Sequence, residues 1–227
     1  ARALAEDVGS GDLTAALIDP HRRARARILA REAAVICGEP WATAAVRALD
    51  PSAAIIWHVR EGQRCQADQV VVEIEGNAQA LLTAERTALN FLQLLSAVAS
   101  KTAVFVDAVA SVPGNRAAIV DTRKTIPGLR LAQKYAVRMG GGTNHRIGLH
   151  DAVLIKENHI AAAGGVTTAL QRAGQAAQAA KFIEIEVETL EQLREALDAG
   201  ARMVLLDNMT LEQMRQAQPD VVLTDVK

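Results

Sequence analysis

Basic side chains are concentrated in one stretch of the sequence, and acidic side chains in another. Residues 121–160 hold seven basic and three acidic residues, whereas residues 183–227 hold four basic and ten acidic residues. Cationic groups bind carboxylates and phosphates, and arginine does so through two parallel hydrogen bonds. Carboxylates suit Mg²⁺, sugar hydroxyls or a positive charge that develops on carbon. The pattern therefore predicts a site for an anionic ligand in which cationic and acidic groups face one another.

Two groups of basic residues follow apolar segments that read as strands. Arg123 and Lys124 closely follow residues 117–120, after Asp121 and Thr122, and Lys156 comes directly after residues 152–155. In α/β enzymes, ligands bind at the ends of the strands. We therefore expect these three side chains to face a bound anion.

The run MGGGTNHR, residues 139–146, brings three glycines beside His145 and Arg146. Glycines allow a backbone to approach a ligand closely, although three of them can also form an ordinary turn. His145 and His150 have a spacing that a metal pair could use. Arg146 lies between them, however, and its charge would repel a cation, so metal binding is the weaker interpretation.

Residues 183–188, IEIEVE, alternate strictly between aliphatic and acidic side chains. On a strand, Glu184, Glu186 and Glu188 share one face and the aliphatic residues share the other. Buried charge is costly unless it is paired or metal-bound, so an acidic face inside a barrel would mark a functional site. The alternative is an edge strand with one face in water.

The elements that must position these residues change in character after Pro113-Gly114. Short apolar runs then alternate with helical stretches, which is typical of parallel βαβ units. The earlier part is mixed α and β, with helices predicted over residues 40–49 and 81–101. Arg86 lies away from the leucine face of the second helix, and spacing alone favours a solvated charge. The predicted strands are residues 24–31, 55–59, 69–75, 117–120, 152–155, 182–187, 203–206 and 221–223.

A short internal repeat supports the βα reading, because TLEQLR at residues 189–194 recurs as TLEQMR at residues 210–215. Each copy would begin a helix with a threonine N-cap and a glutamine three residues later, the pattern of a capping box. Each predicted helix leads to a strand that ends in an aspartate, Asp207 or Asp225. Such a repeat suits an α/β barrel or an open doubly wound sheet, and the polar strand ends favour the barrel.

The composition of the 227 residues excludes several classes of protein. A net charge of −1 and an aromatic content of 3% argue against a nucleic-acid binder. Cys37 and Cys65 match no metal or disulfide pattern, so we expect buried thiols in a reducing compartment. No signal peptide and no apolar run of about 18 residues is evident, so we expect a cytoplasmic protein that does not bind a membrane.

Residues 122–160 resemble the quinolinate phosphoribosyltransferase family through the long run TRKTIPGLRLAQKYAVRMGGGTNHRIGLHDAVLIKENHI. Shorter pieces agree in the same order: EDVGSGDLT, AERTALNFLQLLS, EIEVE and LLDNM. The resemblance extends to about Met214. It implies an α/β fold in which an open-faced α/β sandwich, residues 1–100, precedes an incomplete α/β barrel of parallel strands, residues 101–227.

The resemblance also implies a pentosyltransferase reaction. The family transfers the phosphoribosyl group of 5-phosphoribosyl 1-pyrophosphate to the ring nitrogen of quinolinate, with Mg²⁺ as cofactor. The products are nicotinate mononucleotide, pyrophosphate and CO₂, a step of de novo NAD biosynthesis. The implied assembly is a homodimer, or a hexamer built as a trimer of dimers, in which the long helix lends Arg86 to the neighbouring site.

The resemblance assigns the cationic residues to the anionic parts of the two substrates. Arg123, His145 and Arg146 would hold the two carboxylates of quinolinate. Lys124 and Lys156 would face the phosphate and pyrophosphate groups.

The resemblance assigns the acidic residues Glu186 and Asp207 to Mg²⁺ or to the ribose hydroxyls. The implied catalytic residues are Lys124, Lys156, Glu186 and Asp207. The implied substrate-binding residues are Arg86, Thr122, Arg123, Lys124, His145, Arg146, Lys156, Glu186 and Asp207.

The chain departs from the family after the LDNM segment. Members continue with strands that end in glycine-rich turns, which would hold the ribose 5-phosphate through backbone N–H groups. Here the sequence reads QAQPDVVLTDVK, in which residues 221–226 could substitute for one of these strands. We expect an incomplete 5-phosphate site and an incomplete barrel, and weak or no activity if the chain ends at Lys227.

Two other functions compete with this one. Lys156 could be the Schiff-base nucleophile of a barrel aldolase, although such an amine needs a lowered pKa and dry surroundings. Alternatively, a non-catalytic or altered-specificity paralogue of the same fold would bind a carboxylate or oxyanion.

Overall fold

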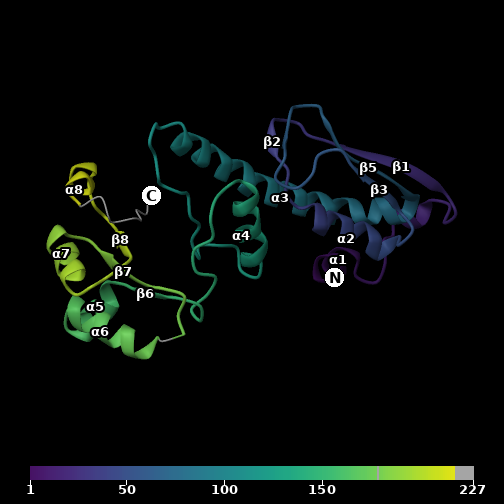
Figure 1. Ribbon diagram of the computed structural model, residues 1–227. Coiled ribbons are helices and arrows are strands. Elements are labelled where there is room, and N and C mark those ends of the chain that lie inside the picture. Colours follow the sequence, from purple (N-terminus) through teal and green to yellow (C-terminus); the bar gives the residue numbers. More distant parts are fainter. Residues whose placement is uncertain (178, 218–227) are drawn as a thin grey trace. The chain divides into compact units, whose positions relative to one another are not determined.

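The computed structural model describes residues 1–177 and 179–217 and divides into two compact units, Ala1–His145 and Arg146–Lys227 (Figure 1). The elements, in chain order, are α1 (Arg2–Val8), the 3₁₀ helix η1 (Ala15–Leu17), β1 (Arg23–Leu29), β2 (Ala34–Val35), α2 (Glu39–Leu49), β3 (Ala54–Trp57), β4 (Arg64–Cys65), β5 (Val70–Asn77), α3 (Ala78–Ala110), α4 (Arg130–Met139), β6 (Val153–Ile155), α5 (Glu157–Ala163), α6 (Val166–Ala176), β7 (Ile183–Val187), α7 (Leu190–Asp198), β8 (Val204–Leu206) and α8 (Leu211–Gln216).

A three-stranded antiparallel sheet with the order β1-β5-β3 forms one layer of the first unit. The alternation RARARIL in β1 places its arginines on one face, where Arg25 lies opposite Glu75. The other face packs against helices, and Val72 of β5 joins Val46 of α2 and Leu81 of α3 in one core cluster. A sheet with one covered and one open face is an open-faced α/β sandwich.

The helix α3 has 33 residues and is longer at both ends than the predicted 81–101. It begins earlier because Asn77 is an N-cap, whose side-chain oxygen accepts a hydrogen bond from the N–H of Ala80 at 3.0 Å. It ends later because residues 102–110 contain neither proline nor glycine, and the first helix breakers are Pro113-Gly114.

By length and composition, α3 is also the one helix within the described residues that could cross a membrane, with a mean hydropathy of 1.4 over 18 residues. This corrects the expectation that no apolar stretch reaches that length. The expectation counted uninterrupted apolar runs, whereas α3 carries isolated charged residues within an apolar sequence. Core helices can have the same composition, and α3 contributes Leu95 and Ala99, both with 0% exposure, to the core of its unit.

The predicted helix over residues 40–49 is confirmed as α2, with Pro40 in its first turn. Cys37 and Cys65 are buried and free, as expected. Burial raises the pKa of the Cys37 thiol, so the thiol is poorly reactive.

One predicted strand is not formed, and another lies outside the described residues. Residues 117–120 do not form a strand, because the chain beside them is the glycine turn and offers only one pairing, the parallel bridge between Val120 and Thr143. The predicted strand at residues 221–223, with Asp225 after it, lies outside the described residues.

Three parallel strands in the order β6-β7-β8 form the sheet of the second unit. Ile185 of β7 pairs with Ile155 on one side and with Val204 on the other. The aliphatic face of β7 packs against helices, and Ile185 shares a core cluster with Val166 of α6 and Leu193 of α7. Figure 1 shows α5, α6 and α7 bordering these strands.

The predicted threonine caps are confirmed in both copies of the repeat. The Oγ1 atoms of Thr189 and Thr210 accept the N–H groups of Gln192 and Gln213, each at 3.2 Å. The capping box is complete at α8, where Gln213 accepts the N–H of Thr210 at 2.8 Å. At α7, Gln192 instead accepts the N–H of Glu188 at 2.8 Å, so the second bond moves back by one residue.

Candidate functional site

The predicted cationic residues of the first unit lie on two backbone segments that run side by side. Val120 and Thr143 form a parallel bridge between these segments. Arg123 and Lys124 follow the first segment, and His145 follows the second. The structure therefore brings these three residues onto neighbouring parts of the same unit.

Arg123 retains hydrogen-bonding capacity that a ligand could use. The residue is half-buried, and within the described residues its buried Nε has no hydrogen-bond partner. Thr122 shapes the turn, because its Oγ1 accepts the N–H of Lys124 at 3.0 Å. A buried guanidinium donor is costly when unsatisfied, and a carboxylate is the acceptor that suits it.

The three glycines bring their loop close to a helix. A Cβ on Gly140 would lie 2.3 Å from the carbonyl oxygen of Ala99, and a Cβ on Gly142 would lie 2.9 Å from Cγ2 of Thr102. Gly141 has a φ of +88°, which favours glycine. The close approach that these glycines allow is therefore to α3, and not to a ligand as the sequence suggested.

Gly140→Ala should lower the free energy of unfolding by about 1–3 kcal/mol or more, because the new methyl group would overlap the backbone of α3. Gly174→Ala is the matched control, since a Cβ at this position in α6 meets no atom within 4 Å. The control should leave stability unchanged or raise it by up to about 1 kcal/mol. Urea unfolding measures both effects, and wild-type stability of Gly140→Ala would contradict the packing described.

Arg86 lies on the exposed side of α3, one turn after the exposed Leu82. Within the described part of the chain, Arg86 forms no ion pair. The exposed leucines on this helix and on the segment before β1 are Leu13, Leu17 and Leu82. That segment is tied to α3 by a hydrogen bond from Thr83 Oγ1 to Asp12 Oδ2 at 2.9 Å. An unpaired cation beside exposed leucines suits contact with another molecule.

In the second unit, Lys156 and Glu186 form an ion pair at the carboxyl ends of neighbouring parallel strands. Lys156 directly follows β6, and its Nζ donates to Glu186 Oε2 at 2.6 Å. Glu186 lies near the end of β7 and is 6% exposed. The hydrogen bond to Glu186 is the main cause that raises the pKa of Lys156 above its ordinary 10.5, and burial opposes it.

The raised pKa of Lys156 argues against the aldolase alternative. A Schiff-base lysine must be neutral to attack a carbonyl, which requires a lowered pKa. Lys156 is instead held as a cation by a buried carboxylate. Its charge suits electrostatic binding of an anion.

The acidic face of β7 is largely buried. Glu184 is 1% exposed and Glu186 is 6% exposed, whereas Glu188, after the end of the strand, is exposed. Because β7 is the central strand of the described sheet, the alternative of an edge strand with one wet face is wrong.

Asp207 directly follows β8, and its N–H donates to the carbonyl oxygen of Val187 at 3.0 Å. Its charge contributes to the raised pKa of Lys156. Asn208 Nδ2 donates to Asp207 Oδ2 at 3.2 Å and to Glu188 Oε1 at 2.9 Å. Sequence reasoning missed Asn208, whose φ of +55° is one that asparagine tolerates well.

Arg146 is 8% exposed and begins a loop that Asp151 holds in place. The Asp151 carboxylate accepts the N–H of Ile147 at 3.0 Å and the N–H of Gly148 at 2.9 Å. These backbone bonds are the main cause that lowers the pKa of Asp151 below its ordinary range. Asp151, also missed by sequence reasoning, therefore fixes the chain that follows Arg146.

Asp151→Asn should lower the free energy of unfolding by about 1–3 kcal/mol near neutral pH, because an amide N–H₂ would face a backbone N–H. Folding lowers the pKa of Asp151 from 3.8, so the carboxylate stabilises the fold above that value and its contribution is lost as the pH falls through the folded pKa. The difference in the free energy of unfolding between wild type and Asp151→Asn should therefore be constant near neutral pH and should become smaller below about pH 3.8.

Urea unfolding at several pH values measures this difference. Lys181→Met is the control, since its exposed Nζ lies 3.4 Å from Asp151 and contributes little. A difference that stays the same at all pH values would contradict the role given to the carboxylate.

Within the described residues, no group of three or more His, Cys, Asp or Glu side chains is placed to hold a metal ion. A metal bound to this part of the chain would therefore need ligands from a substrate or from water.

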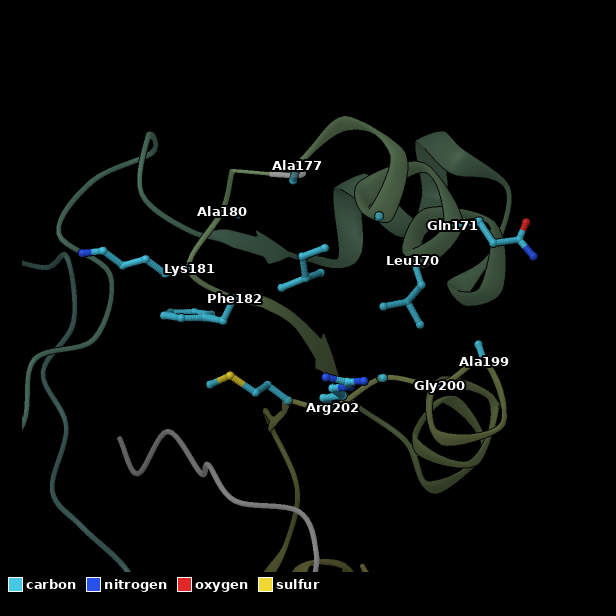
Figure 2. A pocket seen from close by; sticks show the side chains of 13 residues that line it. Leu170, Gln171, Ala177, Ala180, Lys181, Phe182, Ala199, Gly200 and Arg202 are labelled. Carbon is cyan, nitrogen blue, oxygen red and sulfur yellow. The ribbon is translucent and has the colours of Figure 1, made fainter.

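A cavity of about 490 Å³ lies in the second unit at the amino ends of β7 and β8 (Figure 2). Figure 2 shows Lys181, Phe182 and Arg202 around it. The described residues that line it include none of the predicted site residues. Lys156 and Asp207 follow the opposite ends of the strands, where α/β sheets bind ligands. The cavity is therefore not assigned to substrate.

Two family models match the chain. The model described as "Quinolinate phosphoribosyl transferase, N-terminal domain" matches residues 12–96, and the corresponding C-terminal domain model matches residues 98–224. A probable carboxylating nicotinate-nucleotide pyrophosphorylase from Bacillus subtilis is 42% identical over 210 residues, which is 92% of this chain and 72% of the relative. A mitochondrial decarboxylating quinolinate phosphoribosyltransferase from Nicotiana tabacum is 40% identical over 92% of this chain and 61% of its own length.

The fold is similar to solved structures over its whole length. The nicotinate-nucleotide pyrophosphorylase of Francisella tularensis superposes with a TM-score of 0.93 at 41% identity, covering 100% of this chain and 80% of that one. This similarity confirms the predicted fold class, an open-faced α/β sandwich followed by an incomplete α/β barrel. The matched region thus spans about three quarters of these two bacterial relatives and less of the plant one.

Proposed function

Because this chain belongs to the quinolinate phosphoribosyltransferase family, we propose that it makes nicotinate mononucleotide from quinolinate and 5-phosphoribosyl 1-pyrophosphate. Pyrophosphate and CO₂ are the other products. The observation that carries this proposal is the match to both family domains. All nine predicted site residues lie within the matched ranges 12–96 and 98–224.

Quinolinate carries two neighbouring carboxylates, and we assign their binding to Arg123, His145 and Arg146. The buried, unsatisfied Nε of Arg123 supports this role. Arginine can hold a carboxylate through two parallel hydrogen bonds, which fixes the plane of the ring as well as its charge. Thr122 contributes to the same binding turn.

Lys124 and Lys156 are assigned to the phosphate and pyrophosphate groups. Lys156 is held as a cation by Glu186, so it keeps its charge throughout the physiological pH range. Positive charge near the departing oxygen makes pyrophosphate a better leaving group.

The sugar transfer forms a bond between the ring nitrogen and the anomeric carbon while the bond to pyrophosphate breaks. The anomeric carbon passes through an oxocarbenium-like state, and nearby carboxylates stabilise such a cation. We assign this role to Glu186 and Asp207, which also bind ribose hydroxyls. The buried position of Glu186 supports it, because a carboxylate acts more strongly where water is excluded.

Loss of CO₂ then follows from the substrate itself. The ribosylated nitrogen is positively charged and stabilises the carbanion that remains when the adjacent carboxylate leaves. A proton then replaces the carboxylate. The protein needs only to orient the group and to exclude water, so no organic cofactor is required.

Magnesium is proposed as the cofactor. Mg²⁺ commonly binds one or two carboxylates together with substrate phosphates, and Glu186 and Asp207 offer two hard oxygen ligands. The lack of a larger acidic cluster in the described residues agrees with an ion held mainly by substrate. When bound, it would neutralise charge on the pyrophosphate.

The proposed assembly is a homodimer, or a trimer of dimers, in which Arg86 completes the neighbouring site. The exposed Arg86 and the leucines beside it support a protein contact at this face. The proposed domains are residues 1–100 and 101–227, since the family models divide between residues 96 and 98, although the compact units divide after His145. A cytoplasmic location is proposed, while some plant relatives are named mitochondrial.

The experiment that tests the function supplies the full-length protein with both substrates, with quinolinate labelled at the 2-carboxylate. Labelled CO₂ and nicotinate mononucleotide should form in equal amounts, only when both substrates are present. A chelator should stop the reaction, and added Mg²⁺ should restore it. Failure to form either product would exclude the proposed function.

The second candidate is a non-catalytic or altered-specificity paralogue. Calorimetry with quinolinate separates the two candidates. Binding without CO₂ release would identify the paralogue.

A further inference from the structure

We propose that Asp121 and Lys134 are a buried positioning pair that fixes the two cationic segments of the first unit in the geometry that holds quinolinate. The segments are residues 122–124 and the residues that lead to His145. This inference rests on the proposed function and adds two residues to it. We assign no substrate contact to Asp121 or Lys134, so both act through the two segments that they hold in place.

The Asp121 carboxylate gathers donors from both segments and from α4. Nζ of Lys134 donates to Oδ1, and the backbone N–H of His145 donates to the same oxygen at 2.8 Å. Nδ2 of Asn144 donates to Oδ2 at 2.6 Å. The backbone N–H of Asp121 also donates to the carbonyl oxygen of Thr143 at 3.1 Å. One residue therefore joins the segment that precedes Arg123 to the segment that carries His145.

Lys134 connects this carboxylate to a rigid element. It lies on α4, and its side chain is only 3% exposed. Its Nζ also lies 3.4 Å from the carbonyl oxygen of His145, and its own carbonyl oxygen accepts Nδ2 of Asn144 at 2.8 Å. The loop residues Asn144 and His145 are thus bonded both to Asp121 and to the helix.

Stability alone does not account for this pair. The Asp121 side chain is 6% exposed, so both charges are removed from water. Desolvation offsets much of the attraction in a buried ion pair, and apolar residues of the same volume are often as stabilising. The pair instead fixes the relative position of the two segments. Three donors converge on the two oxygens of one carboxylate, and only one arrangement of the segments satisfies them all.

Such an arrangement matters for a small planar dianion. The separation of its two carboxylates is fixed by the ring, so Arg123 and His145 must be held at a matching separation. A misplacement of about 1 Å can cost about a hundredfold in rate. Polar networks and rigid elements behind the binding residues are the usual means of preventing it.

Three variants of the full-length protein test the inference: Asp121→Asn, Lys134→Met and the double variant. Lys134→Met should unfold at a clearly lower urea concentration, because it leaves a buried carboxylate without its cation. The double variant removes both charges and should regain most of that stability. In the double variant, the amide at residue 121 offers only one acceptor oxygen, whereas Asn144 and His145 each donate to a different oxygen of the carboxylate. One of the two segments therefore loses its bond, and calorimetry should give a Kd for quinolinate at least about tenfold above wild type.

A merely structural pair predicts a different result, because binding would then follow stability. A double variant that regains both stability and the wild-type Kd would overturn the inference. Asp50→Asn is the matched control, since Asp50 is also buried and accepts the N–H of Asn77 at 2.8 Å within the sandwich. It should lower stability and leave the Kd for quinolinate unchanged.

If the Asp121 variants do not fold, Asn144→Ala replaces them, because it removes the side-chain hydrogen bonds of Asn144 and keeps the ion pair between Asp121 and Lys134. Its KM for quinolinate should rise at least about threefold while kcat changes less, and an unchanged KM would overturn the inference. A wild-type protein that neither binds quinolinate nor forms product would instead refute the proposed function, and the inference with it. If the wild-type protein turns over and the variants keep the wild-type Kd and KM for quinolinate, the positioning role is refuted while the proposed function stands.

Discussion

Replacement of Arg123 by alanine should lower kcat/KM for quinolinate by at least about a hundredfold, or about 3 kcal/mol. The buried Nε of this residue has no acceptor within the described residues, which fits a guanidinium that meets its partner only when a carboxylate binds. Removal of the side chain would leave that carboxylate without its bidentate partner in a site with little water. Steady-state kinetics with quinolinate as the varied substrate measures the effect.

Arg123→Lys separates charge from geometry. It keeps the positive charge but loses the planar fork, so it should recover only part of the lost activity. Arg116→Ala is the matched control, because Arg116 is an exposed arginine of the same unit with no proposed role. Unchanged turnover and unchanged quinolinate affinity in Arg123→Ala would refute the role of Arg123.

Mixing two inactive variants should restore activity if Arg86 serves the neighbouring subunit. Arg86→Ala and Lys156→Ala homodimers should each lose nearly all activity. In a mixed dimer, one site receives Arg86 from the Lys156→Ala chain and Lys156 from the other chain, so it is complete. Random exchange makes half of the dimers mixed with one complete site of two, and about a quarter of wild-type activity should return.

The control for this experiment mixes Lys156→Ala with Glu186→Ala. These residues bond to each other within one chain, so neither site of a mixed dimer would be complete and activity should not return. Mass spectrometry of the intact complexes confirms that subunits have exchanged. No recovery in the first mixture despite confirmed exchange would count against a role for Arg86 in the neighbouring site.

The strands of the second unit could be predicted because local sequence and burial agree there. Strict alternation in residues 183–188 predicted the strand, with its aliphatic residues together on one face, and these residues pack against helices. Residues 117–120 are also apolar, but they form only one bridge, between Val120 and Thr143. A strand needs a partner strand for its backbone hydrogen bonds, and the neighbouring glycine turn offers only this one pairing. Propensity is local, whereas pairing is not.

The residues of the candidate site could be proposed from the sequence, but the residues that hold them in place could not. Family motifs identified Lys156 and Glu186, and the structure shows them bonded. Nothing in the spacing of Asp121 and Lys134 signals a buried pair, because thirteen positions separate them and the contact depends on how α4 packs. The packing of Gly140 against α3 could likewise not be predicted, since its neighbour Ala99 lies far away in the sequence.

The contact between the glycine turn and α3 has a consequence for protein engineering. Residues 86 and 99 belong to one uninterrupted helix and are separated by roughly 20 Å along its axis. Ala99 shares a core cluster with Ala132 and Ala136 of α4, the helix that leads into the glycine turn, so a larger side chain at residue 99 would displace α4 and the turn that follows it. Libraries that select for thermostability should therefore keep alanine at residue 99, because a shift of α3 there would also reach Arg86 along the same helix.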